Sequence, residues 1–530
     1  MHSMRATRRD ILAGMGTLAV ATSLPSKASA ALPRNFDKLV RDTLAAFGQP
    51  GIAIAVVEGS RTALASGWGV RKLGSSEPVT DATLFNLASC SKAFTSAAVA
   101  LLADEGKLRW NDRVIDHLPE FRLWDSYVTR EITIRDLLVH RSGLPAYSGD
   151  LLLMPPTTYT RPEIVERLRH IQPATSFRAG YAYDNLLYLA VGELVARVSG
   201  MSFEEFIDRR IFKPLDMIDS VPAESWAKDR SNVATPHVRQ GGTVRGLGEM
   251  TPIRRAMPMD ASAPSGGMMS SARDLAKWLT VQVNRGVAAD GQRLYSASQA
   301  ATMWRGVSII RAEGEPHPDA PNFVVYAPGW QLHDYKGHMW IWHSGGLDGS
   351  GSIVGILPEQ KVGIAILSNS EEGQGVFGTL MWTLVDHYLG RPREDRLARS
   401  VKQVAATRAE LAKSADEVVA RPANAAPPTM PLSTYAGVYR DAWYGEVIVG
   451  EDAQGLTIDF SKSPSLKGRL EPWRGDTFRT RFADPNMEDA FLSFGLTPEG
   501  AVDEIRLKAV SPNADVSFDY KDLLLKPIRR

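Results

Sequence analysis

The order of strand-like and helix-like segments in the first 390 residues limits how this chain of 530 residues can fold. Two apolar segments near the start, residues 51–59 and 62–72, have strand character and are joined by a short turn that contains Gly59. Three more strand-like segments lie within residues 338–369, and the region between the two groups is mostly helical. A sheet needs cover on its apolar faces, so this order predicts one sheet built from both ends of the region. A helical insert then lies on one side, with the active cleft between the two.

Amphipathic segments mark the helices of this mixed α+β arrangement. They occupy residues 36–47, 161–171, 185–200, 202–212 and 271–283. The segment that starts at Ser202 has Glu205 three residues later, which is the pattern of a capping box. The first helix is expected to pack against the sheet. Hydrophobic residues make up 44% of the chain and charged residues 23%, values that are ordinary for a soluble globular protein.

The character of the sequence changes after residue 390. A charged helical segment and a Pro/Ala-rich linker fill residues 391–430, and short alternating strands separated by turn residues fill residues 431–530. The sequence therefore predicts a main domain over residues 31–390 and a small all-β domain at the C-terminal end, of a barrel type.

The first 30 residues have the features of an export signal. Arg8 and Arg9 precede a short apolar run over residues 11–24, and the small residues Ala28 and Ala30 follow. The paired arginines are typical of Tat-type signals, which predicts a periplasmic or secreted protein. The alternative is an amphipathic helix of the mature chain. No window reaches the roughly 18 unbroken apolar residues of a membrane helix, so stable membrane insertion is not expected.

Composition excludes several other classes of function. The net charge of +1 leaves no electrostatic footprint for nucleic acid. Cys90 is the only cysteine, which rules out an internal disulfide, and it is interpreted as a small buried packing residue. His338 and His343 are separated by an odd number of residues on a predicted strand and face opposite sides, which makes a poor metal pair. We expect no metal and no cofactor.

A serine and a lysine in the segment FNLASCSKAFTSAAVALLADEG (85–106) are candidates for nucleophilic chemistry. Ser89 and Lys92 are three residues apart at the start of a predicted helix over residues 89–105, so they share a face. A lysine desolvated by apolar walls can accept the proton of a serine hydroxyl. The alternative is an N-cap serine beside a surface lysine. The same spacing recurs at Ser225 and Lys228, but in a polar loop without an apolar helix behind it.

Two later segments complete a possible site. Tyr183 and Asn185 stand immediately before an apolar helix, and His343 and Gly345 stand at the end of a predicted strand. Either group also has a structural interpretation: Tyr183 as a core aromatic residue, and His343 as a hydrogen-bonded interior histidine.

With these three motifs in this order, the chain resembles the serine penicillin-recognising superfamily, specifically the class C β-lactamase-like branch that includes D-aminopeptidases and family VIII carboxylesterases. Flanking segments such as LLVHRSGLP and SGGMMSSARDLAKWL are similar to that branch, and the resemblance covers residues 36–390. It implies a mostly antiparallel sheet flanked by helices, together with an all-α lobe. The C-terminal domain resembles the lipocalin-like domains that some members carry.

The resemblance also implies roles for the motif residues. Ser89 would be the acylated nucleophile, and Lys92 would be its base or would hold Tyr183 as a phenolate. Tyr183 would carry the proton to the leaving group. His343 would orient Tyr183 or the substrate, and Asn185 would bind Lys92 and a substrate amide.

The third motif would supply an oxyanion site. The backbone N–H groups of Ser89 and Gly346 would form it, next to Gly345. Many β-lactamases have lysine where this chain has His343. Within the family, histidine at this position resembles peptidases and esterases more than antibiotic hydrolases.

The sequence therefore predicts an exported serine hydrolase that acts on small or unusual peptides, such as D-residue or linearised cyclic peptides, as a peptidase or amidase. A carboxylesterase, a β-lactamase and a non-enzymatic penicillin-binding sensor remain the alternatives. The expected partner is a short-peptide or small-molecule substrate. The C-terminal domain is expected either to cap the cleft or to form a homo-oligomer interface.

Overall fold

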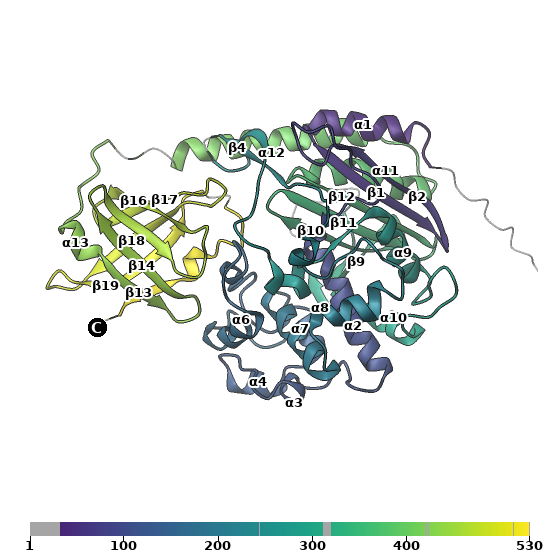
Figure 1. Cartoon of the computed structure of the whole chain (residues 1–530), viewed down its shortest axis with the longest axis horizontal. Helices are drawn as coiled ribbons and strands as arrows, with labels where there is room; N and C mark the ends of the chain where they lie inside the picture. The colour runs from purple at the N-terminus through teal and green to yellow at the C-terminus, as the bar shows by residue number, and fades with distance from the viewer. Residues whose placement is uncertain are drawn as a thin grey trace, which may run out of the picture. The chain divides into compact units, whose positions relative to one another are not determined.

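An eight-stranded antiparallel sheet forms the centre of the main domain, with strand order β2-β1-β12-β11-β10-β9-β8-β7 (Figure 1). The computed structural model describes residues 32–528 except 243, 311–319, 419–420, 422 and 512–513, so the predicted export signal lies outside the described residues. The strands are β1 Gly51–Glu58, β2 Arg61–Gly69, β7 Ser308–Ile310, β8 Val324–Ala327, β9 Trp330–Tyr335, β10 His338–Leu347, β11 Ser350–Leu357 and β12 Val362–Ser368. Strand β1, near the start of the main domain, pairs with β12, near its end, as the order of segments predicts.

Side chains of β1 alternate between two hydrophobic cores. Ile52, Ile54 and Val56 pack in the core that contains helices α1 (Phe36–Phe47) and α11 (Gly373–Tyr388). The intervening Ala53 and Ala55 belong to the other core, where α9 (Ala272–Val283) lies against the sheet. Both faces of the strand are therefore buried, which explains its nearly unbroken apolar sequence.

A helical lobe lies between the two groups of strands in the sequence. Its helices are α2 Ser91–Asp104, α3 Val114–His117, α4 Ser126–Glu131, α5 Ile134–Leu138, α6 Arg161–Arg167, α7 Leu186–Ser199, α8 Phe203–Ile207 and α10 Ala297–Met303. The predicted capping box of Ser202 and Glu205 is present at the start of α8. Among the described residues no single helix is long and apolar enough to span a membrane; only the bent pair Leu186–Ser199 and Phe203–Phe212 passes that test, on length and composition.

The structure corrects two details of the sequence interpretation. The predicted helix over residues 89–105 is divided: a short 3-10 turn, Ala88–Cys90, precedes α2, which begins at Ser91. Strands β7, β8 and β9 were not predicted. Their residues alternate only weakly between buried and exposed positions, so the period-two signal is poor.

Residues after 430 form a closed eight-stranded barrel, which confirms the predicted all-β domain. Its strands are β13 Gly437–Asp441, β14 Gly445–Asp452, β15 Gly455–Phe460, β16 Lys467–Arg474, β17 Thr477–Phe482, β18 Ala490–Leu496, β19 Val502–Ala509 and β20 Leu524–Pro527. Buried aromatic rings fill the interior; Tyr435, Phe478 and Phe494 pack edge to face on one another. The fold is thus a mixed α+β domain followed by a barrel.

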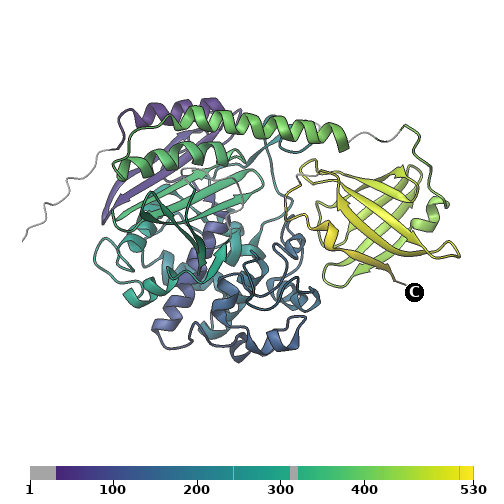
Figure 2. The ribbon, with the colours of Figure 1, turned by 180° about the vertical axis from the view of Figure 1, so that it is seen from behind.

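Helix α12 (Arg396–Val418) connects the two domains in the sequence and packs on α11 and α1, on one side of the sheet (Figure 2). The buried side chain of Arg396 anchors its first turn, since its guanidinium pairs with the Asp386 carboxylate of α11 and donates to the Tyr335 hydroxyl at 3.0 Å. The charged sequence after residue 390 is therefore part of the packing around the main sheet.

Gly355 of β11 offers a test of the packing between β10 and β11. A Cβ atom at this position would lie 2.0 Å from the ring of Trp340, which is fully buried. We expect Gly355→Ala to lower the free energy of unfolding by about 1–3 kcal/mol, because neither the ring nor the strand has room to move. Gly180→Ala is the control, because nothing lies within 4 Å of its Cβ position. Denaturant unfolding of both variants gives the comparison, and equal stability would contradict this description of the core.

Candidate active site

Ser89 lies in the tight turn that leads into α2 and faces a cavity of about 290 Å³. The preceding residue, Ala88, has a positive φ of 44°, a backbone conformation that costs free energy and is concentrated at functional sites. Its N–H donates to the Asn86 side chain at 2.6 Å, which helps to fix the turn. The serine hydroxyl therefore stands at the N-terminal end of a buried helix and opens to a cavity.

Lys92 is fully buried one turn later, and its amine has three oxygen neighbours. The Nζ atom lies 2.7 Å from the Asn185 Oδ1 atom, 2.7 Å from the Ser265 carbonyl oxygen and 3.2 Å from the Ser89 Oγ atom. Burial lowers the pKa of Lys92 to about 7, and Asp150 opposes this shift. Burial in turn raises the pKa of Asp150 to about 7. The structure thus excludes the alternative of a surface lysine.

These contacts define what the neutral amine can do. A neutral amine has two N–H groups and one lone pair. The Asn185 oxygen and the Ser265 carbonyl can only accept, so they take the two N–H groups. The lone pair is then directed at the Ser89 hydroxyl, which is the arrangement that a general base requires.

Tyr183 lies beside this pair in its neutral form. Its ring centroid is 4.7 Å from the Lys92 amine. Its hydroxyl is buried beside Ser89, and no described residue lies in hydrogen-bonding geometry with it. Burial raises the pKa of Tyr183 well above its usual value, and the neighbouring Ser89 offsets this only in part. The structure therefore favours a protonated phenol over a phenolate in the free protein.

His343 is a buried, uncharged neighbour of the site. Its Nδ1 atom lies 2.6 Å from the Ser344 carbonyl, to which it donates, so its Nε2 atom accepts from the Tyr326 hydroxyl at 2.9 Å. Burial and the nearby Lys92 lower the pKa of His343 to about 3. His343 therefore makes the hydrogen bonds expected of an interior histidine and also lines the cavity.

Gly345 and Gly346 have different surroundings. A Cβ atom on Gly345 would lie 2.4 Å from the Leu87 carbonyl and 2.8 Å from the Ala88 Cβ atom, so this glycine lets β10 approach the Ser89 turn. Gly345 is not among the residues that line the cavity, whereas Gly346 is, and it has open space around it. Of the two predicted substrate-binding glycines, only Gly346 faces the cavity.

Asp150 is a site residue that the sequence analysis missed. It accepts from the Asn185 side-chain amide at 2.8 Å and so directs the Asn185 carbonyl oxygen towards Lys92. Its other carboxylate oxygen is buried without a partner among the described residues. Asp150 lies in a short turn whose sequence has no motif. Only its position five residues after Pro145, the last residue of the LLVHRSGLP segment, could have drawn attention to it.

Residues of the C-terminal domain also reach this site. Ser517 donates to the Asp150 carboxylate at 3.3 Å, and Asp519 accepts from the backbone N–H groups of Gly149 and Leu151. Asp515 and Val516 line the cavity. The sequence alone left open whether the barrel caps the cleft, and these contacts show that residues 515–517 form part of the wall, while Asp519 binds the turn around Asp150.

Two other reactive groups singled out in the sequence lie outside this arrangement. Cys90 is buried, its thiol donates to the His343 carbonyl at 3.2 Å, and burial raises its pKa to about 12. The second serine–lysine pair is a surface feature, since Lys228 is exposed. No group of metal-ligating side chains large enough to hold an ion occurs in the part of the chain that the structure describes.

Comparisons with known proteins place this fold in a family whose members are generally serine hydrolases. Residues 36–388 match the Beta-lactamase family, so the chain belongs to that family. Residues 421–527 match a domain of unknown function, DUF3471.

The chain is similar to several known proteins. The unguisins hydrolase ungD of Aspergillus violaceofuscus is 28% identical over 81% of this chain and 79% of its own length. Penicillin-binding protein 4 of Amycolatopsis lactamdurans is 30% identical over 64% of this chain and 86% of its own length. The octameric penicillin-binding protein homologue from Pyrococcus abyssi has a similar fold, with a TM-score of 0.58 at 19% identity over 93% of this chain and 99% of that one.

Asp150 is expected to influence the pH dependence of the site. Activity should rise with pH as Lys92 loses its proton, with an inflection near its pKa of about 7. Burial raises the pKa of Asp150 to about 7, so this group ionises in the same pH range as Lys92. Its ionised form favours the charged form of Lys92, so Asp150→Asn should lower the pKa of Lys92 and move this inflection to lower pH. The profile of kcat/KM against pH, measured with an activated ester, tests this expectation.

The remote surface variant Asp290→Asn serves as the control and should leave the profile unchanged. A loss of activity in Asp150→Asn without any shift of the inflection would indicate a purely structural role for this carboxylate.

Proposed function

We propose that this protein is a serine hydrolase that forms an acyl-enzyme at Ser89 and acts on small peptides as a peptidase or amidase. The observation that carries the proposal is the buried Lys92 amine, whose two acceptors leave its lone pair for the Ser89 hydroxyl. A protein that only binds penicillin-like molecules would also need this serine. Repeated turnover of a substrate distinguishes an enzyme from such a protein.

The proposed reaction proceeds in two halves. Lys92 takes the hydroxyl proton of Ser89 while the serine oxygen attacks the substrate carbonyl, and the backbone N–H groups of Ser89 and Gly346 receive the negative oxygen. The Tyr183 hydroxyl then donates its proton to the leaving nitrogen as the C–N bond breaks, and protonated Lys92 returns a proton to Tyr183. A water molecule, deprotonated by the same pair, attacks the ester and releases Ser89.

The charge of the cavity supports an amide or peptide substrate rather than a β-lactam. None of the described side chains that line it is a lysine or arginine, whereas Asp150 and Asp515 are both in its wall. His343, which stands where many relatives have lysine, is uncharged because its pKa is about 3. An anionic substrate therefore meets no lysine or arginine side chain in this wall, and the Asp515 carboxylate disfavours it.

The size of the cleft supports a peptide over a small ester. The Ser89 cavity continues on one side into a cavity of about 540 Å³, with which it shares Leu153, Met259 and Ser262. On the other side it continues into one of about 640 Å³, with which it shares Ser344, Gly346, Leu347 and Asp515. The similarity to an unguisins hydrolase over most of both chains also supports a hydrolase function.

Export through a Tat-type signal and homo-oligomerisation through the C-terminal barrel complete the proposal. The first rests on the Arg8 and Arg9 pair, and the second gains support from the octameric homologue of similar fold. Cell fractionation of the full chain and light scattering of the purified protein would test them.

The nucleophile assignment predicts the behaviour of Ser89→Ala. This variant should lose all measurable hydrolysis, and its melting temperature should stay close to that of the unmodified protein, because Ser89 is partly exposed to the cavity. A fluorophosphonate probe should label the unmodified protein and not the variant. Labelling of the variant, or activity above a few per cent, would contradict the assignment.

A substrate panel separates the reaction classes. We expect D-aminoacyl amides or short peptides to be turned over faster than p-nitrophenyl esters of matched size, and a cephalosporin to be turned over slowest. The comparison uses kcat/KM for each compound, with mass spectrometry to detect an acyl-enzyme that persists. Faster turnover of the ester would favour a carboxylesterase, comparable turnover of the cephalosporin a β-lactamase, and a stable adduct without turnover a sensor.

A further inference from the structure

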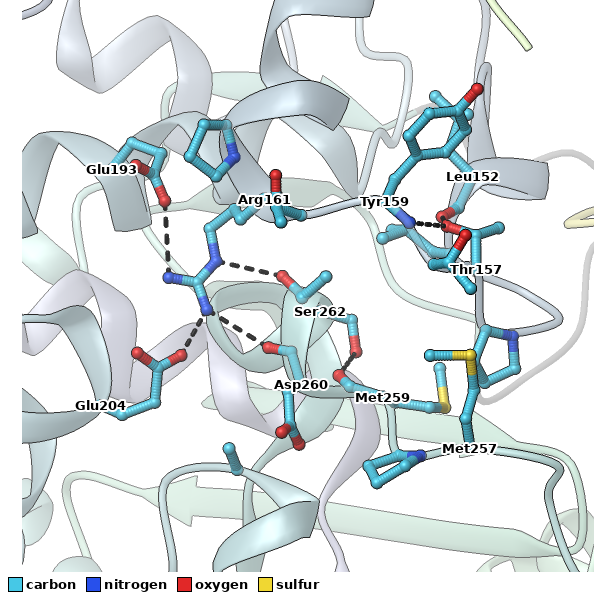
Figure 3. Close-up of a pocket in the computed structure, with 18 of the residues that line it drawn as sticks. Leu152, Thr157, Tyr159, Arg161, Glu193, Glu204, Met257, Met259, Asp260 and Ser262 are labelled. Atoms are coloured by element: carbon cyan, nitrogen blue, oxygen red, sulfur yellow. Dashed lines mark hydrogen bonds and ion pairs between the residues drawn. The ribbon is translucent and has the colours of Figure 1, made fainter. Parts of the chain in front are cut away.

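A second cavity adjoins the Ser89 cavity and is formed entirely by residues of the main domain. Its volume is about 540 Å³, against about 290 Å³ for the Ser89 cavity, and the two share Leu153, Met259 and Ser262 in their walls. Residues 152–162 form one side of it and residues 257–262 another (Figure 3). We call it the side chamber. Its volume is in the range of known small-molecule sites.

The one cation in the described wall of the side chamber is already engaged. The Arg161 guanidinium pairs with Glu204 and lies 3.6 Å from the Glu193 carboxylate. It also donates to the backbone carbonyls of Ala261 at 3.1 Å and Asp260 at 3.2 Å (Figure 3). These partners surround the guanidinium, so it has little capacity left to bind a substrate carboxylate.

The rest of the wall combines apolar side chains with uncharged hydroxyl groups, and it contains a third carboxylate, Asp260. The sulfur-containing side chains of Met257 and Met259 lie together on one side (Figure 3), and Leu152 and Leu153 are also in the wall. Trp226 is also in the wall and is 45% exposed, an unusual exposure for so large an apolar residue. Methionine side chains adapt their shape to different apolar partners, which suits a wall that contacts variable side chains.

We propose that the side chamber is a substrate subsite that binds a bulky, uncharged side chain, aliphatic or aromatic, next to the bond cleaved at Ser89. The proposal rests on the proposed function, because it assigns the chamber to the same substrate. Apolar surface of the side chain replaces water against Met257, Met259 and Trp226. A carboxylate side chain would face Glu193 and Glu204 without a free cation. A basic side chain is the competing occupant, and the test distinguishes it.

The test uses a series of aminoacyl amides that are identical except for one residue. This residue is glycine, leucine, phenylalanine, lysine or aspartate. With the unmodified full chain, kcat/KM should be about 10-fold or more higher for leucine and phenylalanine than for glycine, as hydrophobic pockets of this kind discriminate. The double variant Trp226→Ala, Met257→Ala should reduce that ratio several-fold while kcat/KM for the glycine compound stays unchanged. Neither residue touches the Ser89 cavity wall.

The matched control is the double variant Trp124→Ala, Tyr127→Ala, which also removes two large side chains. Both are exposed, and neither lines the side chamber or the Ser89 cavity. This control should leave the ratio unchanged. Equal rates for glycine and leucine, a ratio that does not respond to Trp226→Ala, Met257→Ala, or a lysine compound that is best of all would overturn the proposal.

A binding measurement separates this inference from the proposed function. The Ser89→Ala protein is titrated by calorimetry with the glycine and leucine compounds, which requires no chemistry. Tighter binding of the leucine compound, lost when Trp226→Ala and Met257→Ala are added, would support the subsite even if the unmodified protein hydrolysed nothing. Hydrolysis by the unmodified protein combined with equal binding of both compounds would leave the proposed function intact and overturn the subsite.

Discussion

The burial of one amine is the constraint on which the site depends. Lys92 has no exposed surface, and moving a charged ammonium group into such a place is costly unless the group becomes neutral or finds partners. Here it does both: desolvation lowers its pKa to about 7, and Asn185 and Ser265 supply oxygen acceptors. The same environment that disfavours the charge leaves the lone pair of the neutral amine directed at the Ser89 hydroxyl, which is the basis of the role that we propose for it.

Backbone packing brings the motifs together around that amine. Strand β10 can approach the Ser89 turn because Gly345 has no side chain, and two further contacts hold the pair. The Cys90 thiol donates to the His343 carbonyl, and the Ser352 hydroxyl donates to the Leu87 carbonyl at 2.6 Å. The lone cysteine thus contributes as a small buried group that fixes the sheet against the nucleophile turn.

The proposed substrate preference rests on the surroundings of the site more than on the motifs. A neutral His343 and the carboxylates of Asp150 and Asp515 give the cavity no attraction for anions. Arg161 is engaged by Glu193 and Glu204, so the described wall of the adjoining side chamber offers apolar side chains but no free cation. The barrel adds Asp515, Val516 and Ser517 to the cavity wall, and Ser517 and Asp519 hold the turn that contains Asp150.

The sequence by itself determined the parts of this protein that follow from local periodicity and spacing. Alternation and helical spacing placed β1, α7 and the barrel, and three short motifs identified Ser89, Lys92 and Tyr183 because each combines a reactive side chain with an apolar element. Tertiary structure alone decided the rest. Asp150 has no motif, the different roles of Gly345 and Gly346 depend on how closely β10 approaches, and the protonation of Lys92, Tyr183 and His343 depends on burial. Contacts between residues far apart in the chain, and the exclusion of water that they cause, exist only once the chain has folded.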